Sequence, residues 1–203
     1  MHMETKPVLP WSERVRAAVR RALYAWIEPL AARAGQLGLT PNRITTVGCV
    51  LSVLAAGLVY VGYWGAGGAM FLFAGGLDML DGAVARTHGQ ATPFGALWDS
   101  TLDRIGEAAM FIAVALHFAG TKPLLFAALV AWFASLLTSY VRARTEGLGG
   151  YCNEGWITRP ERVVLLAAGL MFGVLEVVVW LLAAGGALTV AQRLWLSHRD
   201  LAR

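Results

Sequence analysis

Long charge-poor stretches dominate this sequence and restrict the folds that are open to it. The chain has 203 residues, of which 57% are hydrophobic and 15% charged, whereas about 25% of the residues of a soluble domain are charged. Apolar runs of about 20 residues, each long enough to cross the ~30 Å hydrocarbon core of a bilayer, recur along the chain. We expect six membrane spans, at 44–63, 68–86, 93–119, 122–145, 160–174 and 177–197. The sequence therefore predicts an all-α polytopic membrane protein.

The residues before the first span predict an amphipathic helix. Over 11–34, apolar residues such as Trp11 and Leu23 recur at helical spacing, with arginines between them. Such a helix lies in the membrane interface, or alternatively packs on the cytoplasmic face of the protein. Pro41 at a first helical position starts the span that follows. We therefore expect an amphipathic juxtamembrane segment, 1–40, and a six-helix membrane domain, 41–203.

The Lys and Arg residues predict the orientation. All of them except Lys122 lie in or near the two termini and the loops between spans 2 and 3 and between spans 4 and 5. The positive-inside rule places these segments, and hence both termini, in the cytoplasm. The formal net charge of +4 thus reflects topology and indicates no nucleic-acid partner. With only Cys49 and Cys152, no disulfide framework is expected.

Four aspartates interrupt the second and third spans. Asp78 and Asp81 form D-x-x-D, and Asp99 and Asp103 form D-x-x-x-D, so each pair lies on one helix face. The short connecting loop makes the two spans antiparallel neighbours. At ~1.5 Å per residue, Asp78 should then lie level with Asp103, and Asp81 with Asp99. Ionisable groups at membrane depth are costly, which indicates a functional site.

This acidic group predicts a metal centre. Four carboxylates so close together cannot all stay ionised without cations, and oxygen ligands suit Mg²⁺, Mn²⁺ or Ca²⁺ rather than zinc. The small residues Gly82, Ala85 and Gly95 leave room for a nucleotide beside the metals. Arg86 is placed to meet a phosphate, or is an ordinary charge at the end of a span. If the four aspartates made only a structural polar contact between helices, their negative charge would be poorly balanced, because Arg86 and Arg104 alone lie near them in the sequence.

The whole pattern, D-x-x-D-G-x-x-A-R followed after eight residues by G-x-x-x-D-x-x-x-D, resembles the signature of the CDP-alcohol phosphotransferase family at every fixed position. The resemblance implies a homodimeric enzyme, dependent on two Mg²⁺ or Mn²⁺ ions, that displaces CMP from a CDP-linked alcohol with an acceptor hydroxyl. The implied metal ligands are Asp78, Asp81, Asp99 and Asp103, of which Asp99 and Asp103 are catalytic and Asp103 is the general base. The implied CDP-binding residues are Gly82, Ala85, Arg86, Gly95 and Asp99.

Arginines gather at the cytoplasmic ends of the fourth and fifth spans. Arg is the side chain best suited to bidentate phosphate binding, so we expect a second phosphate site there, although topology alone also explains arginines at span ends. The segments S-Y-V-R-A-R at 139–144 and R-P-E-R at 159–162 are similar to those of the branch of the family that uses inositol phosphate. The candidate acceptor-phosphate ligands are Arg142, Arg144, Arg159 and Arg162.

The expected reaction transfers a phosphatidyl group from CDP-diacylglycerol to a phosphorylated polyol, with inositol 1-phosphate favoured, and releases CMP. Two alternatives keep the chemistry: di-inositol phosphate synthesis from CDP-inositol, and phosphatidylglycerophosphate synthesis with glycerol 3-phosphate. A divalent-metal transporter is the alternative outside enzymes, and it leaves the small residues and the arginines unexplained. Glu107, one turn beyond Asp103, either tunes the base or faces a polar cavity.

Overall fold

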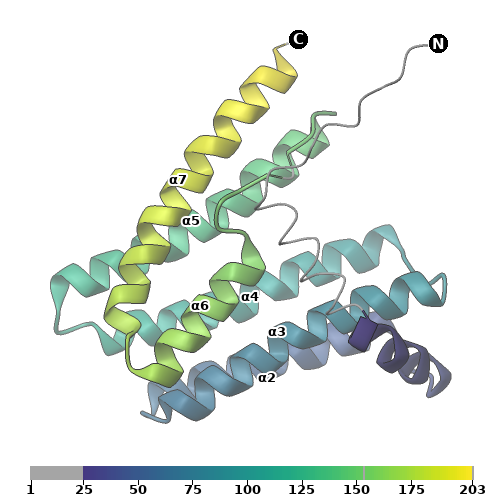
Figure 1. Ribbon diagram of the computed structural model, residues 1–203, viewed down its shortest axis with the longest axis horizontal. Helices are drawn as coiled ribbons and strands as arrows, with labels where there is room; N and C mark the ends of the chain where they lie inside the picture. Colours follow the sequence, from purple (N-terminus) through teal and green to yellow (C-terminus); the bar gives the residue numbers. More distant parts are fainter. Residues whose placement is uncertain (1–24, 153, 203) are drawn as a thin grey trace.

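The computed structural model describes residues 25–152 and 154–202, and the fold of this part of the chain is all-helical (Figure 1). Residues 25–36 form a short helix ahead of the longer ones. The remaining helices are α2 (Pro41–Tyr60), α3 (Trp64–Thr87), α4 (Pro93–His117), α5 (Lys122–Gly147), α6 (Arg159–Phe172) and α7 (Leu175–Leu201). Each of the six expected spans corresponds to one of these helices, with ends that differ by a few residues.

The six helices form two groups that α6 connects. α2 packs against both α3 and α4, and α5 packs along α7. α6 contacts α3 on one side and α7 on the other. Figure 1 shows α2, α3 and α4 side by side, with α5 and α7 inclined to them and α6 between the two groups. The start of α6 therefore lies between the two groups of helices, next to α3.

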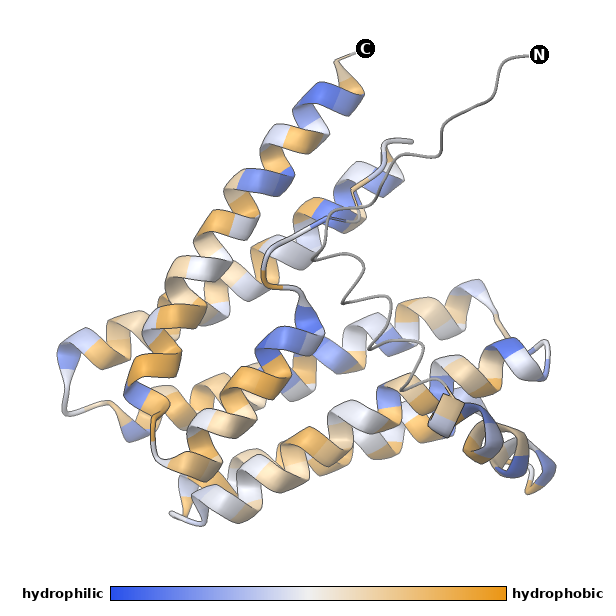
Figure 2. Ribbon diagram, viewed as in Figure 1, coloured by the Kyte–Doolittle hydropathy of each residue, from blue (hydrophilic) through white to orange (hydrophobic). Residues whose placement is uncertain are grey.

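In the part of the chain that the structure describes, four helices are long and apolar enough to cross a bilayer, namely α2, α3, α5 and α7. The chain is thus an integral membrane protein. α4 has a suitable length of 25 residues but carries several charged side chains in its middle, and α6 has only 14 residues. Figure 2 shows the same contrast, since hydrophilic segments interrupt the otherwise hydrophobic helices at the start of α6 and in the facing part of α4.

The predicted amphipathic segment, 11–34, lies largely outside the described residues. Its last part belongs to the helix at 25–36, which buries Ala31 and Ala34 against α2 and α3. The opposite face of this helix is exposed, with Trp26 80% accessible. Its Gly35 lies directly on the ring of His88, because a Cβ atom at this position would come within 2.3 Å of the imidazole. This helix therefore packs at the ends of α2 and α3, next to the loop that follows the first aspartates.

Close helix contact and a capping motif fix the beginning of α6. A Cβ atom on Gly75 would lie 2.9 Å from Cγ1 of Val163, and one on Gly68 would lie 2.9 Å from the carbonyl oxygen of Ala167. Only glycine allows α3 and α6 to approach so closely. At the start of α6, Thr158 and Glu161 form a reciprocal capping box, which satisfies free backbone donors of the first turn. The arginines of this turn are thereby held at a defined height beside α4.

Candidate active site

Three of the four aspartates converge between α3 and α4. Asp78, Asp99 and Asp103 each place one carboxylate oxygen within 4.8 Å of the others. Oxygens bound to one divalent ion at about 2.0–2.6 Å lie roughly 3–5 Å apart, so this spacing is suitable for a shared ion. The three carboxylates come from two helices joined by a short loop. The expectation that these two spans are direct neighbours is wrong, because α2 packs against both helices and α3 and α4 form no closely packed pair among the described residues.

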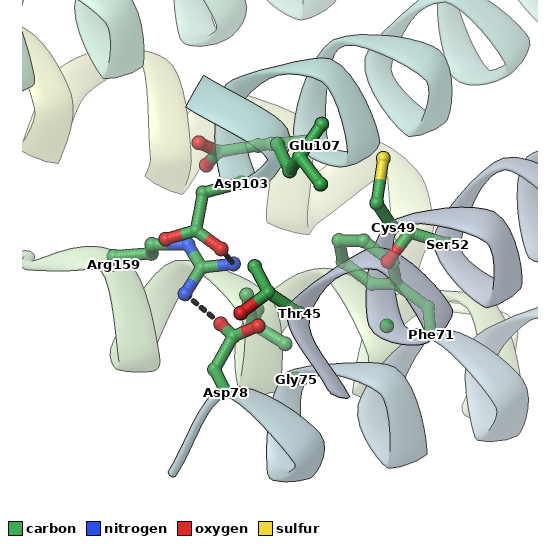
Figure 3. Close-up of a pocket in the computed structure, with 12 residues that line it drawn as sticks. Thr45, Cys49, Ser52, Phe71, Gly75, Asp78, Asp103, Glu107 and Arg159 are labelled. Atoms are coloured by element: carbon green, nitrogen blue, oxygen red, sulfur yellow. Dashed lines mark hydrogen bonds and ion pairs between the residues drawn. The ribbon is translucent and has the colours of Figure 1, made fainter. Parts of the chain in front are cut away.

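Arg159 lies between two of these carboxylates (Figure 3). Its Nη2 atom is 2.7 Å from Oδ1 of Asp103, and its Nη1 atom donates to Oδ2 of Asp78. One side chain from α6 thus bridges α3 and α4, and Asp78 lies level with Asp103 as predicted. Asp103 also lies 3.5 Å from Nη1 of Arg104, which in turn donates to the carbonyl oxygen of Ser100 at 2.7 Å.

An unpartnered oxygen tests whether this group suits a metal. Oδ1 of Asp99 is buried and has no hydrogen-bond partner among the described residues. A buried carboxylate oxygen is costly without a partner, and a divalent ion would satisfy it. Because all the donors are carboxylate oxygens, the set fits a hard ion such as Mg²⁺ or Mn²⁺. The residues that are present therefore fit the metal that the sequence pattern predicts.

The fourth aspartate is held by a residue that the sequence reasoning missed. Asp81 is only 4% exposed, and its Oδ2 accepts a hydrogen bond of 2.5 Å from the hydroxyl of Thr45 on α2. Thr45 also donates to the carbonyl oxygen of Pro41 at 3.0 Å. No sequence signal pairs Thr45 with Asp81, because the two residues are 36 positions apart and the contact depends on how α2 is rotated.

The small residues of the predicted nucleotide site lie at two helix ends. The guanidinium of Arg86 folds over Gly82, with Nη1 3.3 Å from the position of a Cβ atom there. Ala85 is half-buried on the same helix. Gly95 accommodates the side chains of Thr92 and Asn42, which a Cβ atom would meet at 3.0 and 3.2 Å. Asn42, at the start of α2, is a second neighbour of this site that sequence reasoning missed.

The four candidate acceptor-phosphate arginines occupy three different environments. Arg159 contacts the aspartates. Arg142 forms an exposed ion pair of 2.8 Å with Glu146, one turn later on α5, and Arg144 is exposed. Arg162 is buried and pairs with Glu107 on α4. Of the four arginines, only Arg159 thus contacts the acidic group in the described part of the chain.

A small cavity continues from the aspartates into the bundle. Its polar end is lined by Asp78, Asp103 and Arg159, and its inner wall includes Cys49 and Phe71 (Figure 3). Glu107 also lines this cavity, which agrees with the alternative that this residue faces a polar cavity. The clustered carboxylates therefore lie where the polar lining of this cavity meets its apolar lining.

A model of the CDP-alcohol phosphatidyltransferase family matches residues 38–191. The chain belongs to the CDP-alcohol phosphatidyltransferase family. The matched range contains all four aspartates and α2 to α6. The family consists of transferases, so the chain is a phosphatidyltransferase.

Relatives within this phosphatidyltransferase family cover most of the chain. The phosphatidylinositol phosphate synthase of Mycobacteroides abscessus is 40% identical over 179 residues, which are 82% of this chain and 80% of the relative. The crystal structure of phosphatidylinositol phosphate synthase from Mycobacterium tuberculosis with CDP-DAG bound superposes with a TM-score of 0.79 at 35% identity, covering 86% of this chain and 94% of that one. A second structure of that enzyme, in complex with manganese and citrate, also gives a TM-score of 0.79 at 35% identity, with 86% and 90% coverage.

Proposed function

We propose that this enzyme transfers a phosphatidyl group from CDP-diacylglycerol to the hydroxyl of a phosphorylated polyol, with inositol 1-phosphate as the preferred acceptor, and releases CMP. The observation that carries the proposal is the group of three carboxylate oxygens within 4.8 Å of one another, in which Asp99 also has a buried oxygen, Oδ1, without a hydrogen-bond partner among the described residues. The relatives named phosphatidylinositol phosphate synthase support the choice of donor and acceptor.

We propose Asp78, Asp81, Asp99 and Asp103 as the ligands of two divalent ions, Mg²⁺ or Mn²⁺. Such ions, when bound, stabilise negative charge on the attacking and leaving oxygens at phosphorus. The manganese complex of the Mycobacterium tuberculosis enzyme supports this assignment. Thr45 orients the Asp81 carboxylate through its hydrogen bond of 2.5 Å.

Asp103 is the proposed general base. Its Oδ1 is 2.7 Å from Nη2 of Arg159, so a phosphate held by Arg159 would bring the rest of the acceptor next to this carboxylate. A base must lie within hydrogen-bond reach of the proton that it removes. Asp103 would accept the proton of the acceptor hydroxyl as that oxygen bonds to the β-phosphorus and CMP leaves. Asp99 contributes to catalysis as a ligand beside it.

The CDP moiety is proposed to lie against Gly82, Ala85 and Gly95, with Arg86 and Asp99 beside it. At Gly82 and Gly95 the neighbouring side chains come within about 3.3 Å of where a Cβ atom would be, so larger residues would occupy the space that a nucleotide needs. The acyl chains of the donor would remain in the bilayer, next to the exposed apolar faces of the helices.

The acceptor phosphate is proposed to contact Arg159 directly, with Arg142 and Arg144 at the end of α5 completing the positive surface. Arg142 and Arg144 are exposed and are free to reorient towards an incoming anion. Arg162, the fourth arginine of the cluster, is already engaged by Glu107 and would support this site from behind. Because Arg is matched to phosphate geometry, a phosphorylated polyol fits better than an unphosphorylated one.

We further propose that α2 to α7 all cross the membrane, with both termini and the catalytic site on the cytoplasmic side. The charged residues of α4 would face the bundle interior, which is where such residues are tolerated in a membrane. The division into a juxtamembrane segment, 1–40, and a membrane domain, 41–203, and assembly as a homodimer belong to the same proposal.

A product assay with each donor and acceptor tests the function. The purified protein in lipid nanodiscs is incubated with CDP-diacylglycerol or CDP-inositol, and with inositol 1-phosphate, inositol or glycerol 3-phosphate, and CMP release is measured. We expect CMP only with CDP-diacylglycerol and inositol 1-phosphate, and none from Asp103→Asn. CMP release with CDP-inositol, or with glycerol 3-phosphate, would replace the proposed substrates. Metal flux into liposomes without CMP release under any condition would indicate the transporter instead.

A further inference from the structure

A second ion pair lies one helical turn deeper than the pair between Asp103 and Arg159. Nε of Arg162 is 2.9 Å from Oε1 of Glu107, and Nη2 is 3.5 Å from Oε2, so both arms of the carboxylate face the guanidinium. The side chains are only 3% and 7% exposed. Charges so deeply buried are costly unless each has a partner, and here each compensates the other.

The two ion pairs form a ladder between α4 and α6. Asp103 and Glu107 are four residues apart on α4, and Arg159 and Arg162 are three apart on α6, so each couple lies on one helix face. The outer pair joins the metal-binding group, because Asp103 shares it with Asp78 and Asp99. The inner carboxylate, Glu107, is not part of that group in the described residues. Arg159 is thus paired with the acidic group, whereas Arg162 is paired separately with Glu107.

The position of Arg162 makes a separate partner necessary. Its helix is fixed by the capping box at Thr158 and Glu161 and by the close approach of Val163 to Gly75, which holds the base of the Arg162 side chain beside α4. The carboxylate that precedes Glu107 on the same face of α4 is that of Asp103, one turn away. Without a charge on Glu107, Arg162 would compete with a divalent ion for that carboxylate.

We propose that Glu107 is a positioning residue: its ion pair with Arg162 keeps this arginine off the carboxylate of Asp103, so that no guanidinium beyond those of Arg159 and Arg104 competes there with metal and acceptor. Glu107 and Arg162 touch neither metal nor substrate in this role. The inference rests on the proposed function only in requiring that the aspartates bind a divalent ion. It does not depend on which polyol is the acceptor.

Titration with Mn²⁺ alone tests the inference, without substrates. Full-length protein in nanodiscs is titrated, and free Mn²⁺ is followed by its electron paramagnetic resonance signal. We expect Glu107→Gln to weaken Mn²⁺ binding about tenfold or more, because Arg162 becomes free to pair with Asp103. Adding Arg162→Gln should restore the affinity to within about threefold of wild type, because the competing cation is gone. Glu176→Gln, at the exposed first turn of α7, is the matched control and should bind Mn²⁺ like wild type.

The outcomes separate a positioning role from a merely structural one. Unchanged Mn²⁺ affinity in Glu107→Gln, or a double variant that binds as weakly as the single one, would overturn the inference. Thermal unfolding serves as the second readout, since a structural role alone would lower the melting temperature of both variants without any rescue of Mn²⁺ binding. If Glu107→Gln does not fold, Glu107→Asp replaces it. We expect Glu107→Asp to weaken Mn²⁺ binding between about threefold and about tenfold, and wild-type Mn²⁺ affinity in this variant would overturn the inference. Failure of the wild-type protein to bind Mn²⁺ would instead overturn the proposed metal centre as well.

Discussion

The hydroxyl of Thr45 on α2 donates a hydrogen bond of 2.5 Å to the buried carboxylate of Asp81 on α3. This contact joins a helix that carries none of the four aspartates to the acidic cluster. α2 is therefore part of the structure that holds the acidic cluster, since the Thr45 hydroxyl fixes the direction of the Asp81 carboxylate.

Replacement of Thr45 by Val should weaken metal binding. The Asp81 carboxylate is 4% exposed and would lose its neutral donor, at a cost of about 1–3 kcal/mol. We expect a lower melting temperature and a several-fold higher Mn²⁺ requirement in the CMP-release assay. Thr45→Ser keeps the hydroxyl and should behave like wild type. Equal effects of Val and Ser would show that the methyl group, and not the hydrogen bond, matters.

Removal of divalent metal should abolish turnover reversibly. A chelator such as EDTA is expected to stop CMP release, and Mg²⁺ or Mn²⁺ but not Zn²⁺ should restore it, because the ligands are all oxygens. Asp99→Asn should raise the Mn²⁺ concentration needed for half-maximal activity about tenfold or more. The reason is that the buried Oδ1 atom of Asp99 has no hydrogen-bond partner among the described residues and is free for a metal ion. Activity that survives chelation would contradict the metal centre.

Replacement of Arg159 should act chiefly on the acceptor. A charge-assisted hydrogen bond contributes about 1.5–3 kcal/mol, and each 1.4 kcal/mol corresponds to about tenfold in affinity. Arg159→Gln is therefore expected to raise the acceptor KM at least about tenfold, with a smaller change in the KM for the donor. Arg199→Gln, an exposed arginine over the ring of Trp195, is the control. Unaltered acceptor kinetics in Arg159→Gln would argue against the phosphate contact.

Adjacent glycines on α3 should respond in opposite ways to alanine. A Cβ atom at Gly75 would lie 2.9 Å from Cγ1 of Val163, whereas at Gly76 nothing lies within 4 Å. Overpacking of this kind costs about 1–3 kcal/mol, while alanine in an open helical position gains roughly 0.5–1 kcal/mol over glycine. Unfolding of Gly75→Ala should thus occur at lower temperature than wild type, and that of Gly76→Ala should not. If both variants changed the unfolding temperature alike, the close contact between Gly75 and Val163 would not explain the result.

The order and extent of the helices could be predicted because each helix from α2 to α7 coincides with one long apolar run of the sequence. The expected span at 160–174 corresponds to the helix Arg159–Phe172. The expected direct packing of α3 against α4 is wrong, because α2 packs against both of them and α3 and α4 form no closely packed pair among the described residues. The level placement of Asp78 and Asp103 could also be predicted, since rise per residue and a common loop determine it. Whether α4 and α6 cross the membrane stays a prediction.

Contacts between distant helices could not be read from the sequence. Glu107 and Arg162 are 55 residues apart, and their pairing depends on the rotation of α6 about its own axis. That rotation comes from the packing of Gly75 and Val163, which no local pattern encodes. For the same reason, the sequence grouped Arg162 with Arg142 on the basis of charge, although the two side chains differ in burial. The direct phosphate role of the cluster stays a prediction for each of its members.

The short length of α6 determines where Arg159 lies along the helix bundle. With 14 residues it extends only about 21 Å at 1.5 Å per residue, far less than the neighbouring α5 and α7 with 26 and 27 residues. In Figure 1 it starts well inside the molecule while those two continue past it. The first position of α6, which Arg159 occupies, therefore lies short of the ends of those two helices. Under the proposed function, a lipid donor would meet Arg159 from within the bilayer, whereas a water-soluble polyol would have to enter past the ends of α5 and α7.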